Sequence, residues 1–201
     1  MATPGAGRER EERRAGIVAE LERCRADLHW LLEQATPGEL RAASIGTRWT
    51  NEQLLFHMVF GFVVVRTLLP LVRLVSRLPA PVGRGFARVL DALHRPFHVV
   101  NYLGSCAAAL LFNRHRMGAL CDRTIGSLHR SLQRQSDVQL GRGMPFPVRW
   151  DPYFTAFMTV EQVYAYPAQH YAHHRAQLAL AAARERRPWP APTASRGPGQ
   201  G

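Results

Sequence analysis

The sequence contains no lysine, and all 26 of its permanently cationic side chains belong to arginine. Arginine codons are rich in G and C whereas lysine codons are rich in A and T, so this bias indicates a high-GC genome. It therefore weakens the view that each arginine was selected for a function. The formal net charge of +11 could serve binding to nucleic acid, to anionic lipid or to anionic small molecules.

Clusters of basic residues are also lacking. The arginines are scattered from Arg8 to Arg196 rather than gathered on one predicted helix, and no pattern of stacking aromatic residues accompanies them. Both properties argue against an interface for nucleic acid. We therefore expect no nucleic-acid partner.

Cysteine is scarce and its spacing is uninformative. Cys24, Cys106 and Cys121 are far apart, odd in number and free of any CxxC spacing. These features argue against a disulfide framework and against a thiolate zinc site, and they fit a reducing compartment. The first residues include no apolar segment of the kind found in secretory signals. We therefore expect a cytoplasmic protein.

Long apolar runs are missing as well. A membrane-spanning helix needs about 20 consecutive apolar residues, and the uncharged run at 53–65 is shorter than that. The run at 96–113 comes closer in length but contains several polar residues. These runs argue against a spanning helix, while a peripheral contact with a membrane surface stays open as an alternative.

Apolar residues recur at helical spacing along most of the chain. We therefore expect an all-α fold, a four-helix bundle with a long crossover between its second and third helices. The bundle is expected over 9–187, between a flexible leader at 1–8 and a disordered tail at 188–201. The expected helices are 9–34, one from 51 to a kink or end at Pro70, 105–133, and one from 160 to about 187. The crossover at 66–104 is expected to be helical at 82–93 and irregular at 95–104.

Two capping boxes mark the starts of the second and fourth helices. At 50–53 and again at 159–162, a threonine is followed three positions later by a glutamine. In this arrangement the two side chains satisfy free backbone amides at the start of the helix. Trp49, directly before the first box, could pack on Leu54 as a hydrophobic staple.

The fourth predicted helix carries a histidine pair with metal-ligand spacing. His170 and His174 are four residues apart, so their side chains lie on one face about a turn apart and could reach one metal ion. Their face continues an apolar stripe through Val163 and Leu178, which predicts that both point into the bundle. His173 is a competing ligand, but it points about 100° away from His174 around the helix.

A third ligand must come from another helix, and His57, on the apolar stripe of the second helix, is the best candidate. Any single histidine on an apolar face is more often a buried neutral imidazole with one hydrogen-bonded nitrogen. Three that converge would leave several ring nitrogens without partners unless a cation binds them. We therefore predict a metal site at His57, His170 and His174, with purely structural histidines as the alternative.

Four polar residues near the predicted ligands are candidates for orienting them or a substrate: Gln53, Tyr166, Arg175 and Gln177. For the two glutamines, an ordinary hydrogen bond between helices is the competing interpretation. For Arg175, which could bind an anionic group, the competing interpretation is a surface position. No acidic residue stands out as a general base.

These motifs together resemble the DinB/YfiT-like family of bacterial metal-binding four-helix bundles. The residues that carry the resemblance are Trp49, Thr50 and His57 in the second helix, and His170, His174, Arg175 and Gln177 in the last. The resemblance spans roughly residues 15–185. Two features depart from the family pattern, namely the apolar insert between the second and third helices, and Pro167 beside the histidine pair.

The resemblance implies a divalent ion, zinc or nickel, held by three histidines with an open position for water or substrate. The resemblance also implies an activity, because characterised members of that family look like transferases or isomerases that use mycothiol or bacillithiol. Some members have metal-dependent hydrolase activity. The high-GC bias suggests an actinobacterium and therefore mycothiol. We expect a metal-dependent mycothiol S-transferase that acts on a small electrophile. A hydrolase and a non-enzymatic helical binding module stay open as alternatives, and family resemblance makes a homodimer one expectation.

Overall fold

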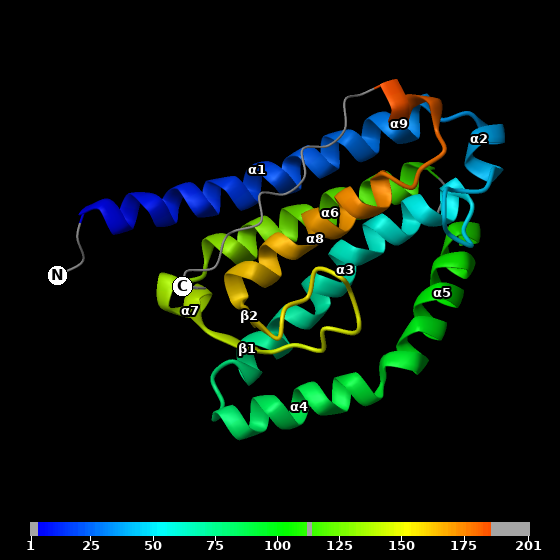
Figure 1. Ribbon diagram of the computed structural model, residues 1–201. Coiled ribbons are helices and arrows are strands. Elements are labelled where there is room, and N and C mark those ends of the chain that lie inside the picture. Colours follow the sequence, from blue (N-terminus) through cyan, green and yellow to red (C-terminus); the bar gives the residue numbers. More distant parts are fainter. Residues whose placement is uncertain (1–3, 112–113, 186–201) are drawn as a thin grey trace, which may run out of the picture.

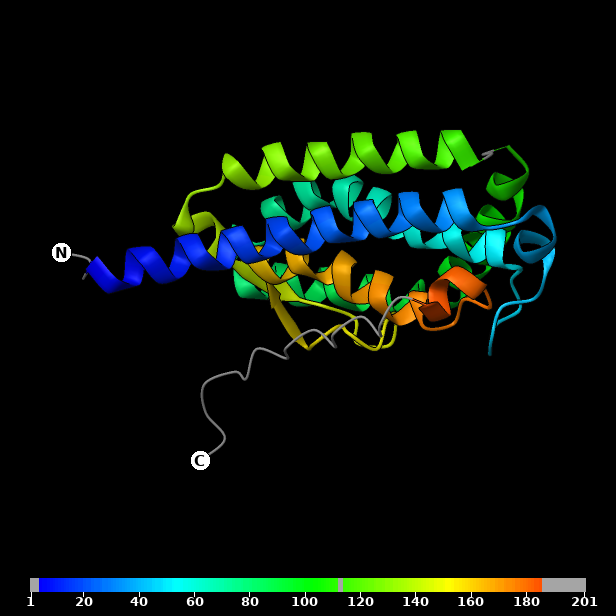
Figure 2. The same ribbon diagram turned by 90° about the horizontal axis from the view of Figure 1, so that it is seen from above.

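The computed structural model describes residues 4–111 and 114–185 of the chain (Figure 1). Within these ranges the fold is all-α, as predicted, apart from one small antiparallel sheet. Four long helices form the bundle: α1 (Pro4–Gln34), α3 (Asn51–Val75), α6 (Arg114–Gln133) and α8 (Val160–Arg175). Figure 2 shows α1 and α6 running alongside α3 and α8.

The shorter elements connect or cover these helices. They are α2 (Pro37–Arg41), α4 (Ala80–Ala92), α5 (His94–Leu111), α7 (Asp137–Gly141), α9 (Ala181–Glu185), β1 (Gly143–Pro145) and β2 (Phe157–Thr159). β1 and β2 pair antiparallel with Met144 opposite Met158. The loop between them, at 146–156, lies between α4 and the bundle (Figure 1).

The central helix of the bundle is α3, which packs against α5, α6 and α8. Its start is the predicted capping box, in which the Thr50 side chain accepts from the backbone of Gln53 and the Gln53 side chain accepts from the backbone of Thr50. Its inward face is fully buried at Leu54, Met58 and Phe62. Burial of these apolar side chains stabilises the packing of α3 in the bundle.

By length and composition alone, α3 could cross a membrane. The sequence predicted that this helix bends or ends at Pro70. In the structure the helix continues to Val75. Of its most apolar window, 39% is buried inside the fold. Central helices of bundles share these properties, so the apolar composition of α3 is not evidence for a membrane protein.

The crossover differs from the expectation. Residues 95–104, predicted to be irregular, lie within α5, and the third bundle helix begins at Arg114 instead of Ser105. Pro96 is the third residue of α5, where its missing N–H removes no helical hydrogen bond because the first four amides have no partner within the helix. Leu111, predicted on the buried face, is 67% exposed.

Both ends of the bundle also differ from the expectation. α1 begins at Pro4, so residues 4–8 of the predicted leader are helical. α8 ends at Arg175, and the short helix α9 follows only after residues 176–180, so the last helix does not run on to 187. The predicted tail at 188–201 lies outside the described residues.

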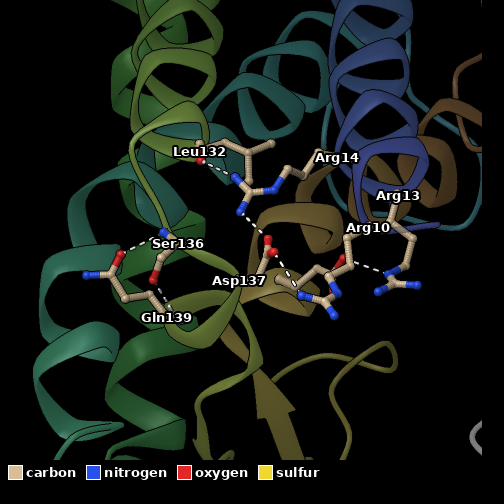
Figure 3. Close-up of polar contacts among 8 residues, drawn as sticks. Arg10, Arg13, Arg14, Leu132, Ser136, Asp137 and Gln139 are labelled. Carbon is tan, nitrogen blue, oxygen red and sulfur yellow. Dashed lines mark hydrogen bonds and ion pairs between the residues drawn. The ribbon is translucent and has the colours of Figure 1, made fainter. Parts of the chain in front are cut away.

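Ion pairs connect the N-terminal part of α1 to α7 and to the start of α8 (Figure 3). Arg10 and Arg14 contact the two carboxylate oxygens of Asp137 on α7, at 3.0 and 2.6 Å. Arg13 contacts Glu161 on α8 at 3.3 Å. These arginines therefore link α1 to the elements that lead into α8.

The interface between α1 and α6 buries two of the three cysteines. Cys24 and Cys121 are fully buried, Cys106 is partly buried, and all three are free thiols. Burial raises the pKa of Cys24 well above its usual value and that of Cys121 to about 12. Both thiols are therefore protonated at neutral pH and act as small packing groups.

Candidate metal centre

His57 on α3 and His170 and His174 on α8 lie together between these two helices. The ring nitrogens that they offer lie within 4.8 Å of one another, and the ring centroids are 4.5, 4.7 and 5.0 Å apart. His57 and His170 are buried and His174 is partly buried. Zinc bonds of about 2.0–2.1 Å hold tetrahedral nitrogens about 3.4 Å apart, so small inward rotations of the rings would place all three on one ion.

Local structure explains why the histidines meet. Each of the two helices starts at a capping box, which fixes the chain register about two turns before His57 and about three and four turns before His170 and His174. Gly61 lies one turn after His57 on α3, and a Cβ at this position would lie only 2.6 Å from Cδ2 of His170. The absence of a side chain at Gly61 therefore makes room for the imidazole that α8 brings in.

Asp151, in the loop between β1 and β2, holds the ring of His170. Its Oδ2 lies 3.2 Å from Nδ1 of His170 and accepts a 2.8 Å hydrogen bond from the Tyr166 hydroxyl. Burial raises the pKa of Asp151, but hydrogen bonds from His170 and from the Tyr153 amide outweigh burial and leave the pKa below its usual value. The resulting carboxylate favours a proton on Nδ1, which leaves Nε2 of His170 as a lone pair.

The other two rings have polar partners at Nδ1 as well. Nδ1 of His174 lies 2.7 Å from Oε1 of Gln177, and Nδ1 of His57 lies 3.4 Å from the Ser105 hydroxyl on α5. The amide oxygen can only accept, so His174 carries its proton on Nδ1. In all three rings, therefore, Nε2 is the nitrogen left for another partner.

The protonation states of His57 and His174 allow both side chains to bind a cation. Burial, followed by the neighbouring imidazoles, lowers the pKa of His57 to about 2 and that of His174 to about 3, so both are neutral at pH 7. Among the described residues, nothing hydrogen-bonds to the buried Nε2 of His170. A buried lone pair without a partner is unfavourable. Imidazoles with free Nε2 lone pairs are the donor set that a divalent metal ion accepts.

Trp49 covers the site from one side. Its indole ring stacks on His57 with centroids 4.4 Å apart and an interplanar angle of 29°, so it contacts the candidate ligand rather than acting only as a staple on α3. Its Nε1–H is buried and has no hydrogen-bond acceptor in the part of the chain that the structure describes. It therefore offers a donor beside the three histidines.

A cavity of about 460 Å³ opens onto the three histidines. It lies between α3, α4 and the loop at 146–156, and most of its lining is apolar. This volume is within the range of small-molecule sites, about 300–1,000 Å³. The arrangement can therefore hold a small organic molecule beside the candidate metal site.

The structure separates the four predicted orienting residues into two groups. Tyr166 and Gln177 do approach the candidate ligands, as described above, whereas the side chain of Gln53 is used in the capping box of α3. Arg175 is neither near the cavity nor on the surface. It is 5% exposed, so the surface position is wrong, and the anionic group that it binds is the carboxylate of Asp27 on α1, to which its Nε donates at 2.8 Å.

Sequence reasoning missed Asp151, Ser105 and Trp49 as neighbours of the ligands. Asp151 lies in a loop, where no periodicity relates it to a helix face. Ser105 was predicted to begin the third bundle helix, but in the structure it lies on α5, which packs against α3. Trp49 did have a signal, because a large aromatic residue directly before a capping threonine lies about two turns from His57.

A family model described as the DinB superfamily matches residues 20–178 of the chain. No curated protein and no solved structure matches it. The matched range includes α3, α8 and all three histidines.

Proposed function

The chain belongs to the DinB superfamily, and on this premise we propose that His57, His170 and His174 bind one divalent metal ion, zinc or nickel. The observation that supports this most directly is the buried Nε2 of His170, which has no hydrogen-bond partner among the described residues and lies beside the neutral imidazoles of His57 and His174. A cation would satisfy all three lone pairs at once.

We further propose that the protein is a thiol S-transferase that uses a low-molecular-weight thiol, with mycothiol as the expected one. A divalent ion on three neutral ligands keeps its full positive charge and lowers the pKa of a thiol or water toward neutrality. No strong protein base is then required. This agrees with the described part of the cavity wall, where the only carboxylate, Asp151, is engaged by His170 and Tyr166.

The residues of the chain would have separate roles in this reaction. Asp151 and Gln177 keep protons on Nδ1 of His170 and His174, which aims Nε2 toward the centre. In the transfer itself, the thiol sulfur forms a bond to an electrophilic carbon of the acceptor. The bond from that carbon to its leaving group breaks, and the thiol proton departs with the leaving group. We place the reaction in the cytoplasm and propose a homodimer, which analytical ultracentrifugation would test.

Metal analysis of protein purified without an affinity tag tests the metal site. We expect about one divalent ion per chain, and loss of that ion in His57→Ala and His174→Ala. His115→Ala is the matched control, because His115 is exposed on α6, and it should keep the ion. Substoichiometric metal in the unmodified protein, together with equal metal in all variants, would rule the site out.

A conjugation assay tests the reaction. Mycothiol and a model electrophile such as 1-chloro-2,4-dinitrobenzene are incubated with the protein, with and without a chelator, and thioether formation is measured. We expect conjugation that chelation abolishes and that metal restores. Conjugation unaffected by chelation, or full metal occupancy without conjugation, would contradict the proposed transferase.

A further inference from the structure

We propose that the acceptor in this reaction is a neutral and largely apolar small molecule, bound in the cavity between α3, α4 and the loop at 146–156. This inference rests on the proposed function and specifies its substrate class. It follows from the shape of the cavity, from the residues that enclose it and from the charges that its wall lacks.

The cavity is elongated along α3. Its lining on this helix includes Gly61, Val64, Leu68 and Leu71, which follow His57 by one to four turns on one face. With a rise of 1.5 Å per residue, Leu71 lies about 21 Å along the helix from His57. An acceptor that fills the cavity would therefore have its reactive end at the histidines and an extended body along α3.

The opposite wall comes from the crossover and the loop. Phe86 and Leu90 of α4 face Phe146, Trp150 and Phe154 of the loop around the cavity. The indole Nε1 of Trp150 donates to the backbone oxygen of Leu90 at 3.0 Å, which fastens the loop to α4. This wall gives the insert at 66–104 a role, because α4 closes the apolar side of the cavity.

Among the described residues, the cavity wall has no arginine that could neutralise an anionic acceptor. Although the chain has 26 arginines, none lines the cavity among the described residues. The single carboxylate on the wall, Asp151, already accepts from His170 and Tyr166 and would repel an anion. Burial of an unpaired carboxylate, phosphate or sulfonate in such a site is strongly unfavourable. The wall therefore selects against acceptors that carry one.

The polar groups of the wall gather near the histidines. Asn101 lies one turn before Ser105 on α5, and Ser105 contacts His57, so Asn101 belongs to the histidine end. Tyr166 and Asp151 lie at the same end, beside His170. Uncharged polar atoms on the acceptor are therefore expected only near its reacting carbon.

Binding of a matched pair of probes tests this proposal. 1-Octanol and octanoate have the same chain length and differ in charge, and isothermal titration calorimetry measures the affinity of the full chain for each. In chelator-treated protein we expect 1-octanol to bind at least about tenfold more tightly, because without a metal ion the carboxylate would lose its hydration and gain no cation. Equal or tighter binding of octanoate, or no detectable binding of 1-octanol, would overturn the proposal.

Two arginine substitutions on α3 locate the binding site. Val64→Arg places a cation in the cavity and should weaken 1-octanol binding while it narrows or reverses the preference over octanoate. Leu74→Arg is the matched control, because Leu74 is on the same helix, is 55% exposed and does not line the cavity. It should leave both affinities unchanged, and an equal effect of the two substitutions would refute the location. Should Val64→Arg not fold, the preference of the unmodified protein still decides the proposal.

The two proposals fail independently. The probe preference is measured after treatment with a chelator, so it reports on the apolar wall and not on metal at the histidines. A preference for 1-octanol without metal at the histidines would refute the proposed function and keep the apolar site. Metal at the histidines together with equal binding of both probes would refute the apolar site and keep the proposed function.

Discussion

Substitution of Gly61 by alanine should damage the candidate metal centre without touching any ligand. The added Cβ would lie 2.6 Å from Cδ2 and 3.1 Å from Nε2 of His170. Carbon atoms in good contact are about 3.5–4.0 Å apart, so the ring must move by about 1 Å or the two helices must separate. Metal–ligand bonds tolerate deviations of only about 0.2 Å. A displacement of this size would therefore remove His170 from the centre.

The expected loss of metal affinity is about 10–100-fold, similar to the effect of removing a group that orients a ligand. Stability should change less. Alanine in place of glycine inside a helix adds about 0.5–1 kcal/mol to the free energy of unfolding, whereas overpacking removes about 1–3 kcal/mol. The net loss is then roughly 0–2.5 kcal/mol, so the variant should fold while it binds metal poorly.

Competition titration with a chromophoric zinc chelator measures the affinity, and urea unfolding measures the stability. Gly85→Ala is the matched control, because Gly85 also lies inside a helix, α4, and nothing lies within 4 Å of the added Cβ. It should keep metal affinity and gain about 0.5–1 kcal/mol in stability. Wild-type metal affinity in Gly61→Ala would show that His170 either is not a ligand or is not confined by α3.

Three further perturbations probe other contacts of the centre and the core. Asp151→Asn removes the charge that favours Nδ1 protonation of His170, so metal affinity should fall about 10–100-fold with circular dichroism unchanged, and unchanged affinity would exclude this role. Arg175→Met leaves the Asp27 carboxylate buried without its partner and should lower the free energy of urea unfolding by about 3–5 kcal/mol; a loss below about 1 kcal/mol would mean that the pair adds little. In metal-free protein, His57 stays neutral when folded down to a pKa of about 2 but is protonated below pH 6.5 when unfolded. Stability present above pH 6.5 should therefore be lost progressively as the pH falls toward 2, and unfolding measured against pH should show a shallower decline for His57→Gln than for the exposed control His115→Gln.

Helix periodicity was sufficient to predict that the three histidines converge. His57, His170 and His174 lie on the apolar stripes of two capped helices, and stripes of this kind turn toward one another in a bundle. Both capping boxes form as the sequence predicts. Features with local sequence rules were therefore predictable.

Features that depend on distant partners were not predictable. The position of Arg175 depends on Asp27, which is 148 residues away on α1, and nothing local distinguishes a buried arginine from an exposed one. Asp151 lies in a loop whose path is set by its contacts with α4. Residues 95–104 were expected to be irregular, but Pro96 is the third residue of α5, where a proline does not interrupt a helix.

The ion pair between Asp27 and Arg175 links α1, which carries none of the three histidines, to their geometry. Arg175 directly follows His174, and its guanidinium is held by both carboxylate oxygens of Asp27, at 2.8 and 3.1 Å. The Tyr171 hydroxyl, one residue after His170, donates to the same carboxylate at 2.9 Å. These two fixed points on α8 prevent the helix from turning about its axis, so the imidazoles, about 100° around the helix from them, keep their direction. α1 therefore helps to orient the histidines of the candidate metal centre, although it carries none of them.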